Sequence, residues 1–224
     1  KYYGDEEEPK LHTGWFEAVP SKELNSDDHE NGTTHWYYAN SKGEITIPTA
    51  DGEVGVVKTI DGKSYLFNSD GEMVTGLRIL TYDGSKITNI SSEVDTADTV
   101  KNMNSDTMKL VYFESNGAAK TGTTTITLDG TSYTFSFKSN GSPRGVGETG
   151  ISDGYIYQNG LRLTADEDTK YGVVTYKNES YVVNEKGSIQ KNKKNLKDAD
   201  ETYYCTNAKG ILLHSSTEKC TTKH

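Results

Sequence analysis

The sequence predicts an all-β protein, a solenoid of stacked β-hairpin repeats that runs as a single array through residues 1–224, with two irregular insertions. One basis is a recurring segment, whose best copy is residues 61–76, DGKSYLFNSDGEMVTG. The other is composition, because only 32% of residues are hydrophobic while tyrosine occurs 15 times. A lone hairpin is marginally stable in water, whereas stacked hairpins bury a continuous strip of rings.

Each copy of the segment contains the same parts in the same order. An Asp-Gly turn, or one similar to it, is followed by a Tyr-rich strand, an Asn-x-x-Gly turn and a short third segment. An ordinary β-sandwich with turns about every eight to twelve residues is the alternative fold. It would not explain why Tyr and Phe recur at a fixed offset before a glycine. The recurring turn glycines are Gly43, Gly71, Gly117, Gly141, Gly160, Gly187 and Gly210.

Several stretches depart from this pattern. Tyr2 and Tyr3 are spaced from Gly14 as Tyr65 is from Gly76, so the chain begins inside a repeat and is expected to be a piece of a longer protein. The first insertion, residues 16–35, is rich in Asp, Asn and Ser and ends at Asn31-Gly32, a type I′ hairpin signal.

The second insertion covers residues 77–109. Within it, Ser92 to Met103 predicts one short amphipathic helix, with Ser92 as its cap and apolar residues spaced three apart. The tail, residues 214–224, has no pattern and is expected to be disordered.

Charge and motifs exclude several function classes. The net charge of −9 disfavours nucleic acid and anionic membrane surfaces as partners, and no run is long enough to insert into a membrane. Residues 145–150 match G-x-G-x-x-G, but a strand and hairpin follow in place of a helix, so no phosphate cradle is expected. No catalytic grouping is recognisable. The sequence therefore predicts no enzyme activity and no cofactor.

Metal binding is not predicted either. The acidic run at residues 5–8 is typical of a solvated turn. The five histidines lack paired ligand spacing; they are His12, His29, His35, His214 and His224. The two cysteines, Cys205 and Cys220, are either free thiols or a disulfide worth about 3 kcal/mol.

The residues from Ser64 to Gly76, SYLFNSDGEMVTG, resemble the cell-wall-binding repeat family. That family includes choline-binding modules, glucan-binding repeats and the carbohydrate-binding tails of clostridial toxins. The resemblance implies a β-hairpin solenoid that attaches a secreted protein to a Gram-positive type of bacterial cell surface.

The resemblance also implies a binding site. In choline-binding members, the Trp after Thr-Gly, the Trp of the Trp-Tyr-Tyr strand and a Tyr of the next hairpin form an aromatic box for a quaternary ammonium. The candidates here are Trp15, Trp36, Tyr38 and Tyr65. At later copies no ring follows the glycine, so at most one box is expected. The residues at that position are Val56, Leu77, Thr123, Ile151 and Val173.

The sequence thus favours a non-catalytic module that recognises a polysaccharide or cell-wall glycan, which could carry choline, by aromatic stacking. The alternative hypothesis is a structural spacer or adhesin module that contacts a protein partner through its insertions and binds no glycan.

Overall fold

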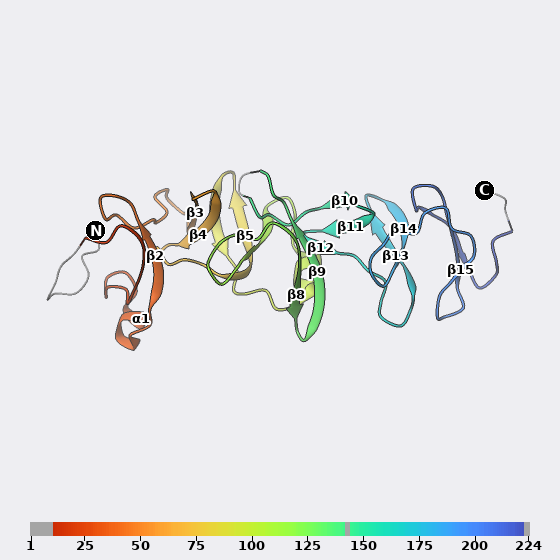
Figure 1. Cartoon of the computed structure of the whole chain (residues 1–224), viewed down its shortest axis with the longest axis horizontal. Helices are drawn as coiled ribbons and strands as arrows, with labels where there is room; N and C mark the ends of the chain where they lie inside the picture. The colour runs from red at the N-terminus through yellow and green to blue at the C-terminus, as the bar shows by residue number, and fades with distance from the viewer. Residues whose placement is uncertain (1–10, 142–143, 222–224) are drawn as a thin grey trace. The chain divides into compact units, whose positions relative to one another are not determined.

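The computed structural model describes residues 11–141 and 144–221. Almost all of the regular structure in these residues is β-strand, arranged in antiparallel sheets (Figure 1). The all-β hairpin-repeat fold is confirmed. The chain divides into two compact units, here called unit 1 (residues 1–122 and 137–146) and unit 2 (residues 123–136 and 147–224), and each is described separately.

Unit 1 contains a two-stranded sheet, β1-β2, and a five-stranded sheet in the order β4-β3-β6-β5-β7. Its elements are β1 (Gly14–Ala18), α1 (Ser26–Asn31), β2 (His35–Ala39), β3 (Gly55–Ile60), β4 (Lys63–Asn68), β5 (Gly76–Asp83), β6 (Lys86–Ile90), α2 (Ala97–Asn102) and β7 (Met108–Phe113).

The remaining strands lie mainly in unit 2. They form sheets in the orders β10-β11-β12-β9-β8, β13-β14 and β15-β16-β17. Their bounds are β8 (Gly122–Leu128), β9 (Thr131–Phe137), β10 (Gly150–Ser152), β11 (Tyr155–Gln158), β12 (Leu161–Arg162), β13 (Tyr171–Tyr176), β14 (Glu179–Asn184), β15 (Leu196–Lys197), β16 (Tyr203–Thr206) and β17 (Leu212–Ser216).

The Asp-Gly turns have the predicted geometry. Asp61 and Gly62 both adopt positive φ, 49° and 77°, which is the signature of a type I′ turn. The turn at Asp129 and Gly130 is the same, with φ of 45° and 75°. Asp tolerates this conformation because its short polar side chain can form local hydrogen bonds. These turns fix the register of the hairpins β3-β4 and β8-β9.

The Asn-x-x-Gly turns are also built alike. The Asn68 Oδ1 accepts hydrogen bonds from the backbone N–H groups of Asp70 and Glu72, at 3.0 and 2.8 Å. The Gly71 N–H donates to the Asn68 carbonyl, and the glycine has φ of 77°. The same hydrogen bonds to the asparagine side chain recur at Asn40, Asn184 and Asn207.

Stacking of one repeat on the next explains why the last position of the Asn-x-x-Gly turn is glycine. The residue two positions after one turn glycine lies against the turn glycine of the next repeat. Ile45 contacts the Gly71 position, Met73 contacts Gly117, and Ile189 contacts Gly210. A side chain at the glycine would collide with this neighbour, so glycine is needed for contact as well as for its positive φ. Repeated contacts of this kind make the array a solenoid.

The first insertion is partly regular. Phe16 to Ala18 belong to β1, and a helix, α1, follows. The predicted hairpin turn at Asn31-Gly32 is wrong, because Asn31 ends this helix and Gly32 is its left-handed cap, with φ of 66°. A glycine after an asparagine serves either purpose, and Asn25, the N-cap directly before α1, decides for a helix.

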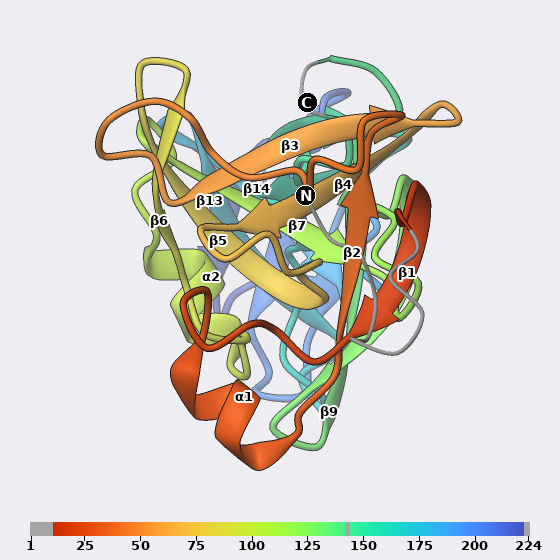
Figure 2. The same cartoon turned by 90° about the vertical axis from the view of Figure 1, so that its left-hand side faces the viewer.

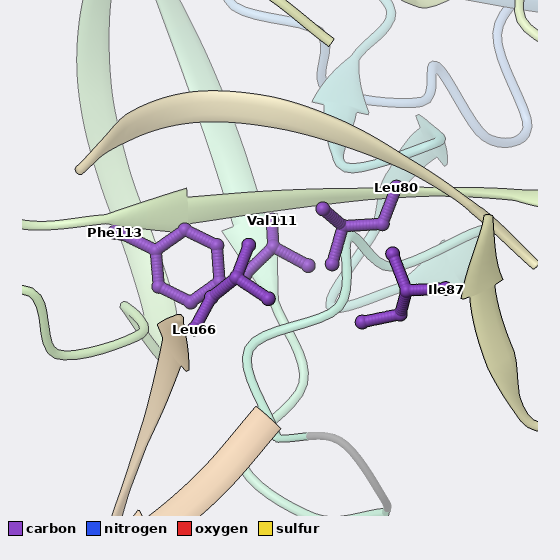
Figure 3. Close-up of a cluster of buried hydrophobic side chains, with 5 residues drawn as sticks. All are labelled: Leu66, Leu80, Ile87, Val111 and Phe113. Atoms are coloured by element: carbon purple, nitrogen blue, oxygen red, sulfur yellow. The ribbon is translucent and has the colours of Figure 1, made fainter. Parts of the chain in front are cut away.

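The second insertion is more ordered than expected. Residues 77–109 supply most of β5, the whole of β6 and the helix α2. The predicted helix exists, but it starts at Ala97 and its N-cap is Thr96, not Ser92. The strands of this stretch help to build a core cluster (Figure 3). Its buried members are Leu66, Leu80, Ile87, Val111 and Phe113.

The prediction that residues 214–224 are disordered is wrong for residues 214–216, because these belong to β17, which pairs with β16. Beyond it, Cys220 is bonded to Cys205 in a disulfide with a Cα–Cα distance of 6.5 Å. Tyr2, Tyr3, the acidic run at residues 5–8 and residues 222–224 lie outside the described residues. Among the residues described, we find no helix with the length and apolar character that crossing a membrane requires.

Candidate functional site

The strands β1 and β2 form an antiparallel pair (Figure 2). One face of this pair is buried, and the other, here called the open face, is partly exposed. Side chains alternate along a strand, so Phe16 and Ala18 share a face with Tyr37 and Ala39. These four residues are buried and form a small core. Alternation therefore sends the odd residues of β1 and the even residues of β2 to the other face.

The open face carries two tryptophans. Trp15 is paired with Tyr38, and Glu17 is paired with Trp36. Residues directly opposite one another on an antiparallel pair lie on the same face, and diagonal neighbours are within reach of aromatic side chains. Trp15 and Trp36 are diagonal neighbours in this register.

Trp15 is the centre of an aromatic cluster, which consists of Trp15, Tyr38, Tyr65 and Phe67. Its ring centroid lies 5.1 Å from that of Tyr38 and 4.8 Å from that of Tyr65, at interplanar angles of 71° and 62°. Phe67 lies 5.8 Å away and is fully buried. The edge-to-face geometry is that of favourably packed aromatic pairs. Two neighbouring hairpins, β1-β2 and β3-β4, thus supply one aromatic surface.

Trp36 lies on the same face but is 45% exposed. Its backbone carbonyl accepts a hydrogen bond from the Met73 N–H at 2.8 Å, so the strand is held in place while the ring remains open to solvent. Of the four predicted site residues, the structure brings Trp15, Tyr38 and Tyr65 into contact. It places Trp36 one diagonal step away.

Charged groups border the aromatic cluster. The Lys58 Nζ lies 5.6 Å from the centre of the Tyr38 ring, in a cation–π contact. Further along the same face, beside Trp36, the Glu17 carboxylate accepts a hydrogen bond from the Thr34 hydroxyl at 3.0 Å. The site therefore offers ring faces, one cation and one anion to a ligand.

Tyrosines elsewhere have their faces covered by cations of the same chain. The Arg162 guanidinium lies 3.8 Å from the centre of the Tyr155 ring and donates a hydrogen bond to the Tyr157 hydroxyl. Lys170 lies over Tyr171 in the same way. The residues after the glycines of unit 2 include Ile151 and Val173, which are exposed and aliphatic. In the aromatic cluster around Trp15, Lys58 lies over Tyr38 at a similar distance.

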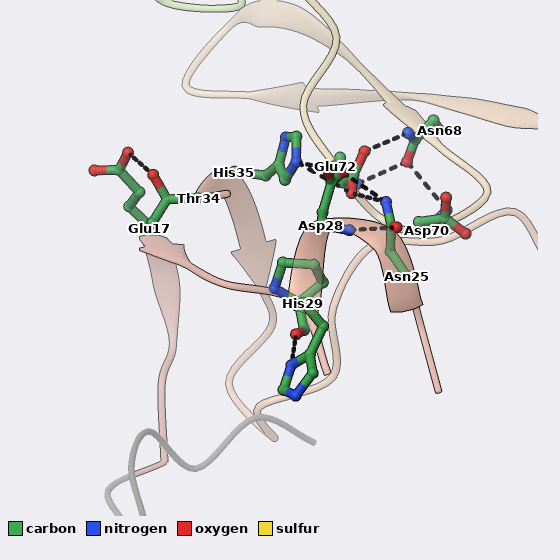
Figure 4. Close-up of polar contacts among 10 residues, drawn as sticks. Glu17, Asn25, Asp28, His29, Thr34, His35, Asn68, Asp70 and Glu72 are labelled. Carbon is green, nitrogen blue, oxygen red and sulfur yellow. Dashed lines mark hydrogen bonds and ion pairs between the residues drawn. The ribbon is translucent and has the colours of Figure 1, made fainter. Parts of the chain in front are cut away.

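A second group of side chains was not predicted from the sequence. Asp28, His35 and Glu72 come together beside this hairpin, with Asn25 and Asn68 hydrogen-bonded to them (Figure 4). Burial, together with the charge of Glu72, raises the pKa of the neighbouring Asp70. The group of Asp28, His35 and Glu72 could not be found from the sequence, because its members are far apart there. Neither the helix α1 nor its contact with the turn after β4 was predicted.

The fold defines a class of structure, the β-hairpin repeat solenoid. No protein-family model matches the sequence, and no curated protein matches it. Two solved structures are similar over 92% of this chain, each at 20% identity. One is a crystal structure of CbpF in complex with ipratropium, with a TM-score of 0.52. The other is choline binding protein F from Streptococcus pneumoniae, with a TM-score of 0.51.

The likeness concerns the fold. This chain covers 50% and 49% of the two solved chains, so it spans about half of their length.

Proposed function

We propose that this chain is a non-catalytic binding module that recognises a polysaccharide or glycan of a Gram-positive type of cell wall. The observation that carries the proposal is the aromatic surface of Trp15, Tyr38 and Tyr65, with Trp36 exposed beside it. The chain's fold, shared with a protein named for binding choline, supports it.

The chemistry of the surface suits a sugar. The apolar side of a pyranose ring stacks on an aromatic face, while nearby polar groups bind its hydroxyls. Trp36 offers an open ring, and Glu17 stands opposite it on the neighbouring strand. A Glu carboxylate accepts hydrogen bonds from hydroxyl groups.

A choline substituent on the glycan fits the same surface. A quaternary ammonium is attracted to ring faces, and edge-to-face rings such as Trp15 and Tyr65 present two faces at a steep angle. The Glu17 carboxylate adds a favourable charge. A single site would bind weakly, and attachment would gain strength from further modules on the same protein.

The experiment is retention of the full chain on immobilised polysaccharides and wall preparations, with free choline as a competing eluent. Trp36→Ala should weaken binding about tenfold, because loss of an aromatic anchor typically costs more than 1 kcal/mol. Trp15→Ala should weaken it further. Ile151→Ala is the matched control, since Ile151 is an equally exposed apolar residue of a later hairpin.

Far-UV circular dichroism checks that each variant is folded. Retention on no glycan or wall preparation would overturn the proposal, and so would unchanged binding by Trp36→Ala and Trp15→Ala. Elution by choline identifies the recognised substituent.

The second candidate is a spacer or adhesin module that contacts a protein. It is favoured by the exposed aliphatic residues that replace the ring after later glycines, such as Ile151 and Val173. Capture of a defined surface protein by the purified chain, with no glycan retention, would decide for it.

A further inference from the structure

Three potential metal ligands converge near the base of the first hairpin. Asp28 lies in α1, His35 begins β2, and Glu72 follows the Asn68-x-x-Gly turn after β4. One ligand atom from each lies within 4.8 Å of the other two. Three segments that are distant in the sequence thus present nitrogen and oxygen atoms to one small volume (Figure 4).

The distances suit a small divalent ion. The His35 Nε2 lies 2.9 Å from the Asp28 Oδ2 and 3.6 Å from the Glu72 Oε1. In a tetrahedral zinc site with bonds of about 2.0–2.1 Å, neighbouring ligand atoms are about 3.3–3.4 Å apart. The two observed distances bracket that value, and the third pair, Asp28 with Glu72, lies within 4.8 Å.

The Glu72 carboxylate is held in place by a second set of groups. Its Oε2 accepts a hydrogen bond from the Asn68 Nδ2 at 2.8 Å, and its backbone N–H donates to the Asn68 Oδ1. Glu72 is only 8% exposed. Hydrogen bonds of this kind orient the carboxylates of metal sites, and here the other oxygen, Oε1, is the one that faces His35.

Asn25, the N-cap of α1, is hydrogen-bonded to two members of the group. Its Nδ2 donates to both the Asp28 Oδ2 and the Glu72 Oε1, at 2.8 and 3.1 Å. The two carboxylate oxygens thus share one donor, the Asn25 amide, which an ion bound between them would displace. Two carboxylates beside one imidazole carry a negative charge that a divalent ion would neutralise.

We propose that Asp28, His35 and Glu72 bind a divalent transition-metal ion of the zinc class, which fastens α1 to the turn after β4. An imidazole nitrogen favours zinc and its neighbours over calcium and magnesium, which prefer oxygen alone. Water completes the coordination, because the three side chains leave one tetrahedral position open.

The test uses the full chain, stripped with a chelator and titrated with zinc chloride alone by calorimetry. The wild type should bind one equivalent. His35→Gln and Glu72→Gln should lower the affinity at least tenfold, the scale that even supporting hydrogen bonds reach in metal sites. His29→Gln is the matched control, since His29 lies in α1 next to Asp28 but its ring contacts the Pro20 carbonyl.

A second readout is stability. Zinc should raise the unfolding temperature of the wild type and of His29→Gln, but not that of His35→Gln. Absence of zinc binding by the wild type would overturn the proposal, as would wild-type affinity in His35→Gln or an equal loss in His29→Gln. Binding of calcium as tight as that of zinc would refute the assignment of the site to ions of the zinc class.

Discussion

Alanine at Gly117 should destabilise unit 1 more than alanine at Gly62, although both glycines have φ of 77°. An alanine Cβ at Gly62 would meet nothing within 4 Å. At Gly117 it would lie 2.7 Å from the Met73 Cγ and 2.8 Å from the Met73 Cε. The two substitutions therefore share their backbone strain and differ in whether a neighbouring repeat must move.

The magnitude follows from these contacts. An L-residue forced into the left-handed region costs about 1–2 kcal/mol, and both variants lose this amount. Overpacking costs a further 1–3 kcal/mol, roughly, in a well-packed region. Because methionine is flexible, the additional loss at Gly117 should fall near the low end, at about 1 kcal/mol.

Urea unfolding followed by tryptophan fluorescence is a suitable assay, since Trp15 and Trp36 both belong to unit 1. The free energy of unfolding is obtained by linear extrapolation for the wild type, Gly62→Ala and Gly117→Ala. The same comparison in a Met73→Ala background forms a double-mutant cycle. In that background, the difference between the two glycine variants should vanish.

Equal losses at the two glycines in the wild-type background would refute the stacking argument. A difference that persists without the Met73 side chain would do the same, because another contact would then be responsible.

Two other predictions concern single side chains of unit 1. Tyr82→Phe should stabilise the unit by about 1 kcal/mol in urea unfolding, because the buried Tyr82 hydroxyl has no hydrogen-bond partner in the part of the chain that the structure describes. Burial raises the pKa of Tyr82 from 10.0 to about 12, so the hydroxyl ionises more readily in the unfolded chain, and the free energy of unfolding of the wild type should fall as the pH rises from 10 through 12. The free energy of unfolding of Tyr82→Phe should fall less over that range, and identical pH profiles would contradict the assignment. Lys58→Gln should strengthen choline binding about twofold in calorimetry, because a cation about 6–10 Å from the Lys58 charge is repelled by about 0.4–0.7 kcal/mol in water. Lys101→Gln, with the same change of charge on α2, should leave the affinity unchanged, and an unchanged affinity in Lys58→Gln would show that no cation binds near Tyr38.

Local chemistry made much of the fold predictable. Asp61-Gly62 and Asp129-Gly130 form the type I′ turns that their sequences predict, because so few residues accept positive φ at both positions. The Asn-x-x-Gly turn is equally local, since the asparagine side chain bonds to backbone groups two and four residues later. The same reasoning failed at Asn31-Gly32, where a glycine ends a helix.

The candidate site was predictable only in its parts. Thr-Gly-Trp and Trp-Tyr-Tyr pointed to Trp15 and Trp36, and both lie on the open face of one hairpin. The strand register decided which ring meets which, so Tyr38 contacts Trp15 while Trp36 is one diagonal step away. Register is set by pairing across the sheet, which no single strand specifies.

The sequence alone determined the Asp-Gly and Asn-x-x-Gly turns, the alternation of strand faces and hence the repeat, because these depend on interactions within a few residues. Tertiary structure alone decided that residues 77–109 join a sheet and that Cys205 bonds to Cys220. It also decided that Asp28 and His35 meet Glu72, since loop closure over 37 residues or more is governed by packing and leaves no local pattern.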